Sequence, residues 1–327
     1  MHLGIDIGGT KTDAVAIDGT GQMLAQFRIS TGYGASGVLD TAEQAVRGMI
    51  DRLDLDLPEI KSIGIGVPGR VDSAHGRVVH AVNLGVEGLN LGEDLATRLG
   101  KQVHVENDVN AAALGAFHLM DANGWPEGGW PIAATPSSLV HSMAYLNLGT
   151  GLAAGVVIDG SLWRGSRGTA GEIGHIPVDP NGPVCPCGQV GCLELFASGT
   201  ALLRQWPSEE QRPAQHLFES ADKGDVEAIH VRNGLLESIA SAVRILVLTV
   251  DVDLVVIGGG IASVGSPLLE GIRGVLEEWA KHSAFLTSLG LAERIRLVPS
   301  GVPIAALGAA FAGAIGTAKA EATVRVA

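Results

Sequence analysis

A short pattern occurs twice in this 327-residue chain, and its two copies lie a whole domain's length apart. Residues 5–19 (IDIGGTKTDAVAIDG) align without a gap with residues 146–160 (LNLGTGLAAGVVIDG). Each copy has the pattern of a strand, a tight glycine turn, a second strand and an Asp-Gly turn. The repeat therefore predicts two related lobes that each open with the same β-hairpin.

The rest of the chain alternates between apolar segments of strand length and segments with helical periodicity. Strands are expected at residues 61–67, 102–106 and 254–257, and helices at 91–99, 109–120, 226–250 and 267–280. This alternation is typical of an α/β fold, and the chain length suggests two domains. Residues 121–142, with Trp125 and Trp130, break the pattern and predict an irregular loop. The Ala- and Gly-rich residues 301–317 predict a helix packed closely against the protein.

Composition and charge exclude several classes of function. A net charge of −13 opposes binding to phosphate backbones, and an aromatic content of 4% opposes a base-stacking platform. The chain shows no signal peptide, and the apolar residues 239–257 are interrupted by Arg244, Asp251 and Asp253, so no membrane span is expected. Three cysteines, an odd number, oppose a disulfide framework. We expect a cytoplasmic protein whose partners are neither nucleic acids nor membranes.

Both glycine turns are candidates for phosphate binding. The first is Asp6-x-Gly8-Gly9-Thr10-Lys11-Thr12, and the second is Gly149-Thr150-Gly151. Glycines let backbone N–H groups turn toward an anion, Thr and Lys add donors, and Asp6 could hold a magnesium-bound water. A plain hairpin turn is the alternative for each. The residues at 64–69 (GIGVPG) match the dinucleotide fingerprint by letter, but strand and turn residues follow them, so we reject that interpretation.

Asp108 lies where the expected strand at 102–106 meets the following helix. One interpretation is a helix N-cap. The other is a general base that takes a proton from a substrate hydroxyl, since ligands of α/β sheets bind beyond the carboxyl ends of strands. The residues alone leave both open.

A Cys–His cluster follows in the second half of the chain. His175, Cys185, Cys187 and Cys192 form a Cys₃His set suited to tetrahedral zinc, and four protein ligands make such a zinc structural. Three free buried thiols are the alternative. Glu172 and Glu194 flank the cluster, either as solvated surface residues or as rigidly held acceptors for hydroxyl groups.

The combined motifs resemble the ROK family of bacterial sugar kinases, in the actin–hexokinase superfamily. The resemblance covers nearly the whole chain and is carried by residues 6–12 (DIGGTKT), 64–72 (GIGVPGRVD), 106–115 (ENDVNAAALG), 171–175 (GEIGH) and 185–194 (CPCGQVGCLE). It implies a two-lobed α/β fold of the actin-like ATPase (ribonuclease H-like) type with an interlobe cleft. Residues 1–115 and the C-terminal helix at about 303–327 would form a small lobe, and residues 116–302 a large lobe with the zinc knuckle.

The resemblance also implies a role for each candidate residue. Asp108 would be the catalytic base. Phosphates of ATP would contact Asp6, Gly8, Gly9, Thr10, Lys11, Thr12, Gly149, Thr150 and Gly151, and its adenosine side Gly258 and Gly259. The sugar would contact Gly69, Asn83, Asn107, Asp108, Glu172, His175 and Glu194, and zinc would be bound by His175, Cys185, Cys187 and Cys192.

The implied activity is phosphorylation of a hexose at its primary hydroxyl by ATP with Mg²⁺. Glucose is the first expected substrate, and glycolysis is the expected pathway. N-acetylglucosamine, mannose, fructose and allose remain alternative substrates, and polyphosphate an alternative donor. A non-catalytic sugar-binding or regulatory ROK protein is the alternative of another class. Such regulators carry a DNA-binding helix-turn-helix before the first glycine turn, and we expect no room for one because that turn begins at Asp6. Family members are often dimers or tetramers, so the resemblance implies a homodimer or homotetramer. Ala153 and Ala154 stand where the family carries glycines, and would crowd the nucleotide or face the core.

Overall fold

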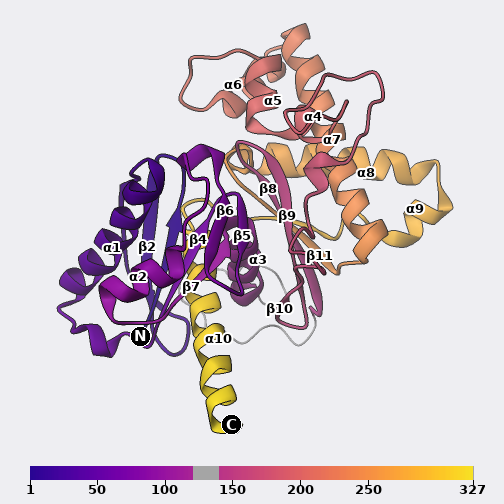
Figure 1. Cartoon of the computed structure of the whole chain (residues 1–327). Coiled ribbons are helices and arrows are strands. Elements are labelled where there is room, and N and C mark those ends of the chain that lie inside the picture. Colours follow the sequence, from indigo (N-terminus) through magenta and orange to yellow (C-terminus); the bar gives the residue numbers. More distant parts are fainter. Residues whose placement is uncertain (121–139, 327) are drawn as a thin grey trace. The chain divides into compact units, whose positions relative to one another are not determined.

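The computed structural model describes residues 1–120 and 140–326, so most of the loop expected at 121–142, with its two tryptophans, lies outside the described residues. The chain forms two compact units (Figure 1). Unit 1 comprises residues 1–139, 160–168 and 301–327, and unit 2 comprises residues 140–159 and 169–300. The boundary expected after residue 115 would fall inside helix α3 (Asp108–Leu119), whose residues all belong to unit 1.

Unit 1 is built on a five-stranded sheet with the order β3-β2-β1-β4-β7. β1 (His2–Ile7), β2 (Lys11–Ile17) and β3 (Met23–Ser30) are antiparallel, whereas β4 (Ser62–Val67) and β7 (Val103–Asn107) run parallel to β1. The short strands β5 (Arg70–Asp72) and β6 (Arg77–His80) form a separate hairpin.

Helices cover both faces of this sheet, as the alternation along β1 requires. Leu3, Ile5 and Ile7 share a core with buried residues of α1 (Gly34–Leu53) and α2 (Leu91–Leu99). Gly4 faces the other way, against α10 (Ile304–Val326), which also packs on β4 and α3. The Ala- and Gly-rich segment is thus a closely packed helix, as predicted. The single-turn helices η1 (Leu57–Glu59) and η2 (Val82–Leu84) complete the unit.

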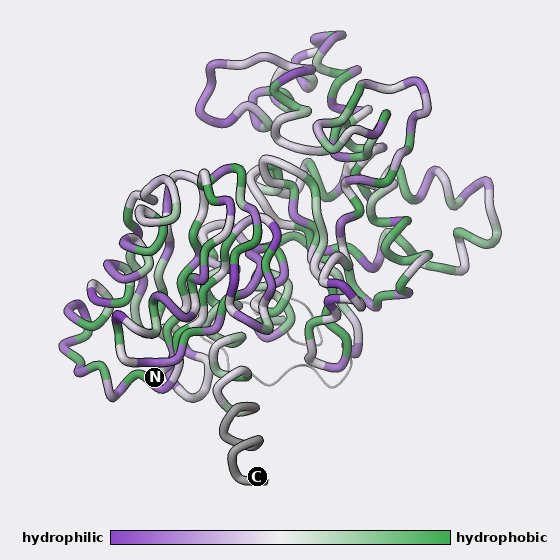
Figure 2. The backbone as a smooth tube through the Cα atoms, viewed as in Figure 1, coloured by the Kyte–Doolittle hydropathy of each residue, from purple (hydrophilic) through white to green (hydrophobic). Residues whose placement is uncertain are grey.

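The second sheet repeats the order of the first, as β10-β9-β8-β11-β12. β8 (Ser142–Leu148) and β9 (Leu152–Ile158) form an antiparallel hairpin, and β11 (Leu254–Gly258) and β12 (Ile295–Leu297) continue the sheet in parallel; β10 is Ser161–Leu162. The prediction that both halves open with the same hairpin is therefore confirmed. Hydrophobic residues run through the strands of both sheets (Figure 2).

The helices of unit 2 lie between its strands and before β12 in the sequence. They are η3 (Ile173–His175), α4 (Glu194–Ala197), α5 (Gly199–Gln205), α6 (Pro213–Asp222), α7 (Val226–Val250), η4 (Ile261–Val264), α8 (Ser266–Lys281) and α9 (Ala284–Leu289). Among the described helices, α7 is long and apolar enough to cross a membrane by length and composition. It packs against α6 and α8 and places Ile239, Val243 and Leu246 in the core of unit 2, which makes it a core helix.

Candidate functional site

The first glycine turn joins β1 to β2. The N–H of Gly8 donates to the carbonyl of Lys11 at 3.0 Å, which closes a tight turn with Gly9, Thr10 and Lys11 exposed. The turn can therefore offer backbone amides, a hydroxyl and an ammonium group to an anion. Thr12 differs from the expectation, because it is buried in β2 and its hydroxyl lies 2.8 Å from that of Thr31. Its hydroxyl therefore faces into unit 1 and not the turn.

Asp6 lies beside this turn, near the end of β1. Its register partners are Asp13 on β2 and Gly66 on β4. Burial and the nearby carboxylates of Asp108 and Asp13 raise the pKa of Asp6 to about 8, although Arg28 opposes the shift. A carboxylate whose pKa is raised by neighbouring carboxylates is suited to binding a divalent cation, and Mg²⁺ prefers carboxylate oxygens together with water. The residues present thus fit the magnesium that the resemblance implies.

Asp108 opens helix α3, directly after β7. The N-cap is Asn107, whose Oδ1 accepts from the N–H groups of Val109 at 3.0 Å and Asn110 at 3.1 Å. The Oδ1 atom of Asp108 accepts from the N–H of Val109 at 2.9 Å and from Nδ2 of Asn107 at 3.1 Å. The cap interpretation therefore belongs to Asn107, and Asp108 is the first residue of the helix proper.

Gly69 and Asn83 border the same turns. Nδ2 of Asn107 donates to the carbonyl of Gly69 at 3.1 Å. Gly69 has φ +93°, and a Cβ there would lie 2.2 Å from the carbonyl oxygen of His80, so only glycine fits. Asn83 is exposed on η2, and a Cβ placed on Gly9 would lie 3.6 Å from the Asn83 side chain. Unit 1 thus brings together its predicted phosphate and sugar residues.

Glu106 is a site residue that the sequence did not single out. Its side chain is only 4% exposed and accepts from Arg164, Ser73, Asn110 and the backbone N–H of Asn107. A carboxylate directly after the buried Val105 of this strand was the available signal.

The second glycine turn joins β8 to β9 in unit 2, and the start of α5 supports it. The carbonyl of Gly149 accepts from the N–H of Gly199 at 2.8 Å, and that of Thr150 accepts from the hydroxyl of Thr200 at 2.9 Å. These bonds occupy carbonyl groups of the turn, not its amides.

Gly258 and Gly259 lie next to this turn. Gly258 is the register partner of Asn147 on β8. Gly259 has φ +89°, and a Cβ there would lie 2.5 Å from the backbone of Leu148, so the two glycine segments approach closely. Ala154 is buried in the core of unit 2, whereas Ala153 lies on the opposite side of β9. The methyl of Ala154 therefore faces the core.

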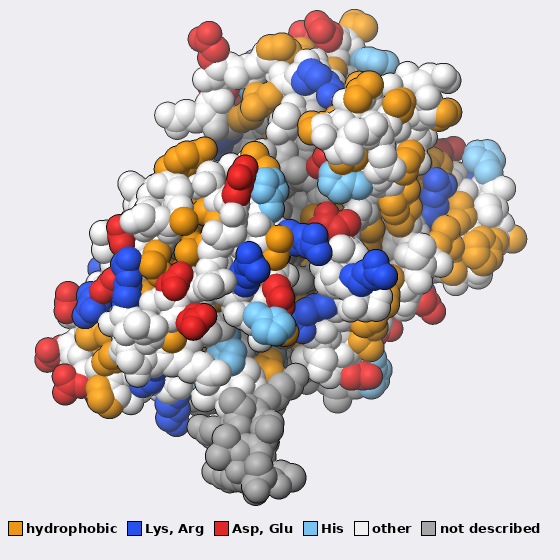
Figure 3. All heavy atoms as spheres, in the orientation of Figure 1, with side chains coloured by type: hydrophobic (Ala, Val, Ile, Leu, Met, Phe, Trp, Pro, Cys, Tyr) orange, Lys and Arg blue, Asp and Glu red, His pale blue; other side chains and the backbone are white. Residues whose placement is uncertain are grey.

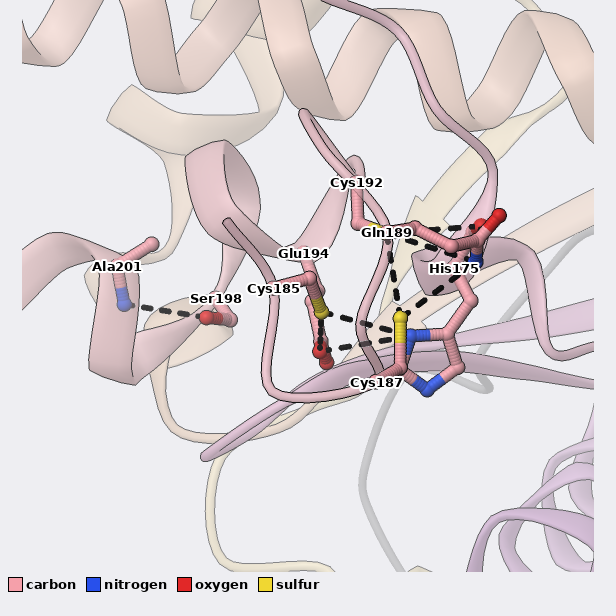
Figure 4. A network of polar contacts seen from close by, with 8 residues as sticks. All are labelled: His175, Cys185, Cys187, Gln189, Cys192, Glu194, Ser198 and Ala201. Carbon is pink, nitrogen blue, oxygen red and sulfur yellow. Dashed lines mark hydrogen bonds and ion pairs between the residues drawn. The ribbon is translucent and has the colours of Figure 1, made fainter. Parts of the chain in front are cut away.

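The Cys–His cluster forms a compact knuckle (Figure 4). One ligand atom from each of His175, Cys185, Cys187 and Cys192 lies within 4.8 Å of all the others. The Sγ atoms of Cys187 and Cys192 are 3.6 Å apart, and Sγ of Cys185 lies 3.9 Å from Nδ1 of His175. Tetrahedral zinc with Zn–S bonds of about 2.3 Å would set such atoms about 3.8 Å apart, so the residues fit a zinc ion.

Glu194 connects the knuckle to the second glycine turn. Its Oε1 lies 3.3 Å from Sγ of Cys185 and 3.6 Å from Nδ1 of His175, and a Cβ on Gly151 would lie 3.2 Å from its Oε2. Nε2 of His175 points away from the sulfur atoms and stays available (Figure 4). Glu172 is exposed just before η3, where its carbonyl accepts from the N–H of His175 at 3.2 Å. Unit 2 thus gathers Glu172, His175 and Glu194 around the knuckle.

Acidic and basic side chains are interspersed on the face shown in Figure 3.

Comparisons with known proteins agree with this geometry. The ROK family model matches residues 2–310 of the chain. The glucokinase of Thermotoga maritima is 32% identical over 288 residues, which cover 83% of this chain and 85% of the relative. The N-acetylmannosamine kinase of Salmonella agona is 31% identical over 276 residues, covering 84% and 87%. A solved ROK family glucokinase from Streptomyces griseus, in complex with glucose and AMPPNP, is 30% identical with a TM-score of 0.73, covering 96% of this chain and 99% of that one.

Proposed function

The chain belongs to the ROK family and has its two-lobed actin-like fold, and we propose that it is a kinase that transfers a phosphoryl group from ATP to the primary hydroxyl of glucose. The observation that carries the proposal is the placement of Asp108 beside Asp6. One turn of unit 1 presents a carboxylate for a hydroxyl proton, and the neighbouring hairpin presents one for a metal ion. Phosphoryl transfer to an alcohol needs both.

Unit 1 supplies the chemistry of the acceptor hydroxyl. Asp108 accepts the proton of the sugar hydroxyl as that oxygen attacks phosphorus, while Asn107 holds the carboxylate through its Nδ2. The amide of Gly9 and the side chains of Thr10 and Lys11 face the phosphates, while the Gly8 N–H closes the turn. Asp6 would hold Mg²⁺, which would supply positive charge to neutralise the phosphates.

Unit 2 supplies the sugar specificity and the second set of backbone donors. Glu172, Glu194 and Nε2 of His175 accept hydrogen bonds from ring hydroxyls. The glycines at 149–151 and 258–259 leave room for the nucleotide. His175, Cys185, Cys187 and Cys192 would hold a structural zinc, which would fix the orientation of His175 and the position of Glu194 beside it. The close spacing of the four ligand atoms supports this part of the proposal.

Glucose is the first substrate to test, because the Thermotoga and Streptomyces relatives are glucokinases. An N-acetylmannosamine kinase of similar identity makes that amino sugar the second candidate. We further propose a cytoplasmic homodimer or homotetramer, which size-exclusion chromatography with light scattering would test.

The test is an ADP-release assay with a panel of hexoses, using ATP or inorganic polyphosphate as donor. We expect turnover with glucose and ATP, and a drop in kcat of at least about 100-fold for Asp108→Asn. Asp94→Asn, in the first turn of α2, is the matched control and should keep full activity. Absence of turnover on every sugar would reject the proposed function, and an active Asp108→Asn would reject the base.

A further inference from the structure

Glu106 is a buried anion whose acceptor capacity is fully used by the described residues around it. Its Oε1 accepts from Ser73 at 2.9 Å, from the N–H of Asn107 at 3.0 Å and from Nδ2 of Asn110 at 3.2 Å. Its Oε2 accepts from Nε of Arg164 at 2.9 Å and from a second guanidinium nitrogen of Arg164. A carboxylate buried to this degree is stable as an anion only because it is paired and hydrogen-bonded.

These donors come from separate parts of unit 1. Ser73 follows strand β5, Asn107 and Asn110 open helix α3, and Arg164 lies in the short segment 160–168. That segment belongs to unit 1, although the chain on either side of it belongs to unit 2. Glu106 therefore fastens three elements to one point, directly before the turn that carries Asp108.

The bonds continue from this point to the Asp108 carboxylate. The backbone N–H of Asn107 donates to Glu106, and the Asn107 side chain caps α3 and donates to Oδ1 of Asp108. Any movement of Glu106 would thus be passed to Asp108 through a single residue. A shift of about 1 Å at a reacting group can cost roughly 100-fold in rate.

We propose that Glu106 and Arg164 are a positioning pair that fixes the 107–110 turn and thereby holds Asp108 in its reactive orientation. Neither residue touches the substrate in this proposal, and both act through Asn107. The consequence for catalysis rests on the proposed function, whereas the consequence for the turn does not.

The first measurement is steady-state kinetics on Arg164→Met, which removes the charge and keeps the aliphatic stem. We expect kcat to fall about 10- to 100-fold while KM for ATP and sugar stays within about threefold, because ground-state binding is not altered. Arg164→Lys should recover most of the loss, because both guanidinium nitrogens meet one oxygen and a single ammonium can replace them. The double variant Glu106→Gln/Arg164→Met should be no slower than the slower single variant.

Arg98→Met is the matched control. Arg98 also bridges carboxylates within unit 1, those of Asp40 and Glu43, but on helices α1 and α2. Its removal should leave kcat within about twofold of the wild type, since exposed pairs contribute little.

The second measurement needs no turnover. Native-state hydrogen exchange of the Val109 and Asn110 amides, which Asn107 caps, should accelerate at least about tenfold in Arg164→Met, with α2 unchanged. If the wild type phosphorylates no sugar, the proposed function is rejected, and the hydrogen-exchange data alone test whether Glu106 and Arg164 fix the 107–110 turn. Unchanged exchange at these amides, a kcat equal to that of Arg98→Met, or a uniform acceleration over all of unit 1 would each overturn the positioning role.

Discussion

Replacing Gly308 by alanine should destabilise the protein strongly, because α10 and α3 meet backbone to backbone at this glycine. A Cβ on Gly308 would lie 1.6 Å from the carbonyl oxygen of Ala111 and 2.7 Å from the N–H nitrogen of Gly115. An ordinary contact at that oxygen begins near 3.4 Å, so the helices must separate by about 1.8 Å. No rotamer change can relieve the clash, since the obstructing atoms belong to the backbone.

Overpacking of this kind costs about 3 kcal/mol, the upper end of the usual range. At about 2 to 4 °C per kcal/mol for a unit of this size, the melting temperature should fall by roughly 6 to 12 °C. Gly274→Ala in α8 is the matched control, because its Cβ would meet nothing within 4 Å. That variant should gain about 0.5 to 1 kcal/mol from higher helix propensity.

Thermal and urea unfolding followed by circular dichroism would measure both variants. The opposite signs are the informative result, since the same substitution is made in two helices. A Gly308→Ala protein as stable as the wild type would refute the close approach of α10 and α3. Because α3 begins at Asp108, the destabilised variant should also lose kcat.

Three further predictions concern the metal sites and a buried histidine. Metal analysis should find about one zinc per chain. The Cys192→Ser variant should lose this zinc, and chelators should no longer lower its stability. Active wild-type protein that contains no zinc would contradict the prediction. The pKa of Asp6 is raised to about 8, so between about pH 4 and 8 the folded protein keeps a proton that the unfolded chain releases. In the absence of divalent cations, the free energy of unfolding should therefore fall as the pH rises through this range. Asp6→Asn should flatten that slope in melting curves, and parallel curves would refute the assignment. His118→Phe should stabilise the protein by about 1 kcal/mol, because both ring nitrogens of His118 are buried without a hydrogen-bond partner among the described residues. The phenyl ring should keep the stacking on Phe311. A lower melting temperature of this variant would show that the imidazole of His118 does have a hydrogen-bond partner.

Sequence patterns located most of the elements because each is specified locally. The helices at 91–99 and 226–250 were predicted with the bounds observed, since the helical pattern of apolar residues begins and ends where each helix does. The repeated hairpin was equally readable, because strand, turn and strand are contiguous.

The missed features depend on contacts between distant residues. Glu106 and Arg164 are 58 positions apart, and no spacing in the sequence connects them.

Asn107 and Asp108 are both good capping residues, and the choice between them depends on where β7 ends. The extended backbone at Asn107, with φ −64° and ψ 142°, gives that residue the cap.

The two hairpins differ in charge at one equivalent position. Asp6 lies opposite Gly66 in the first sheet, and its counterpart Asn147 lies opposite Gly258 in the second. The second copy thus keeps a glycine as the register partner, but it replaces the carboxylate with a neutral amide. A cation needs the anionic copy, whereas a polyphosphate would be repelled by two such carboxylates. If Asp6 holds the metal as proposed, the neutral Asn147 leaves the second turn without a charge that would repel a phosphate.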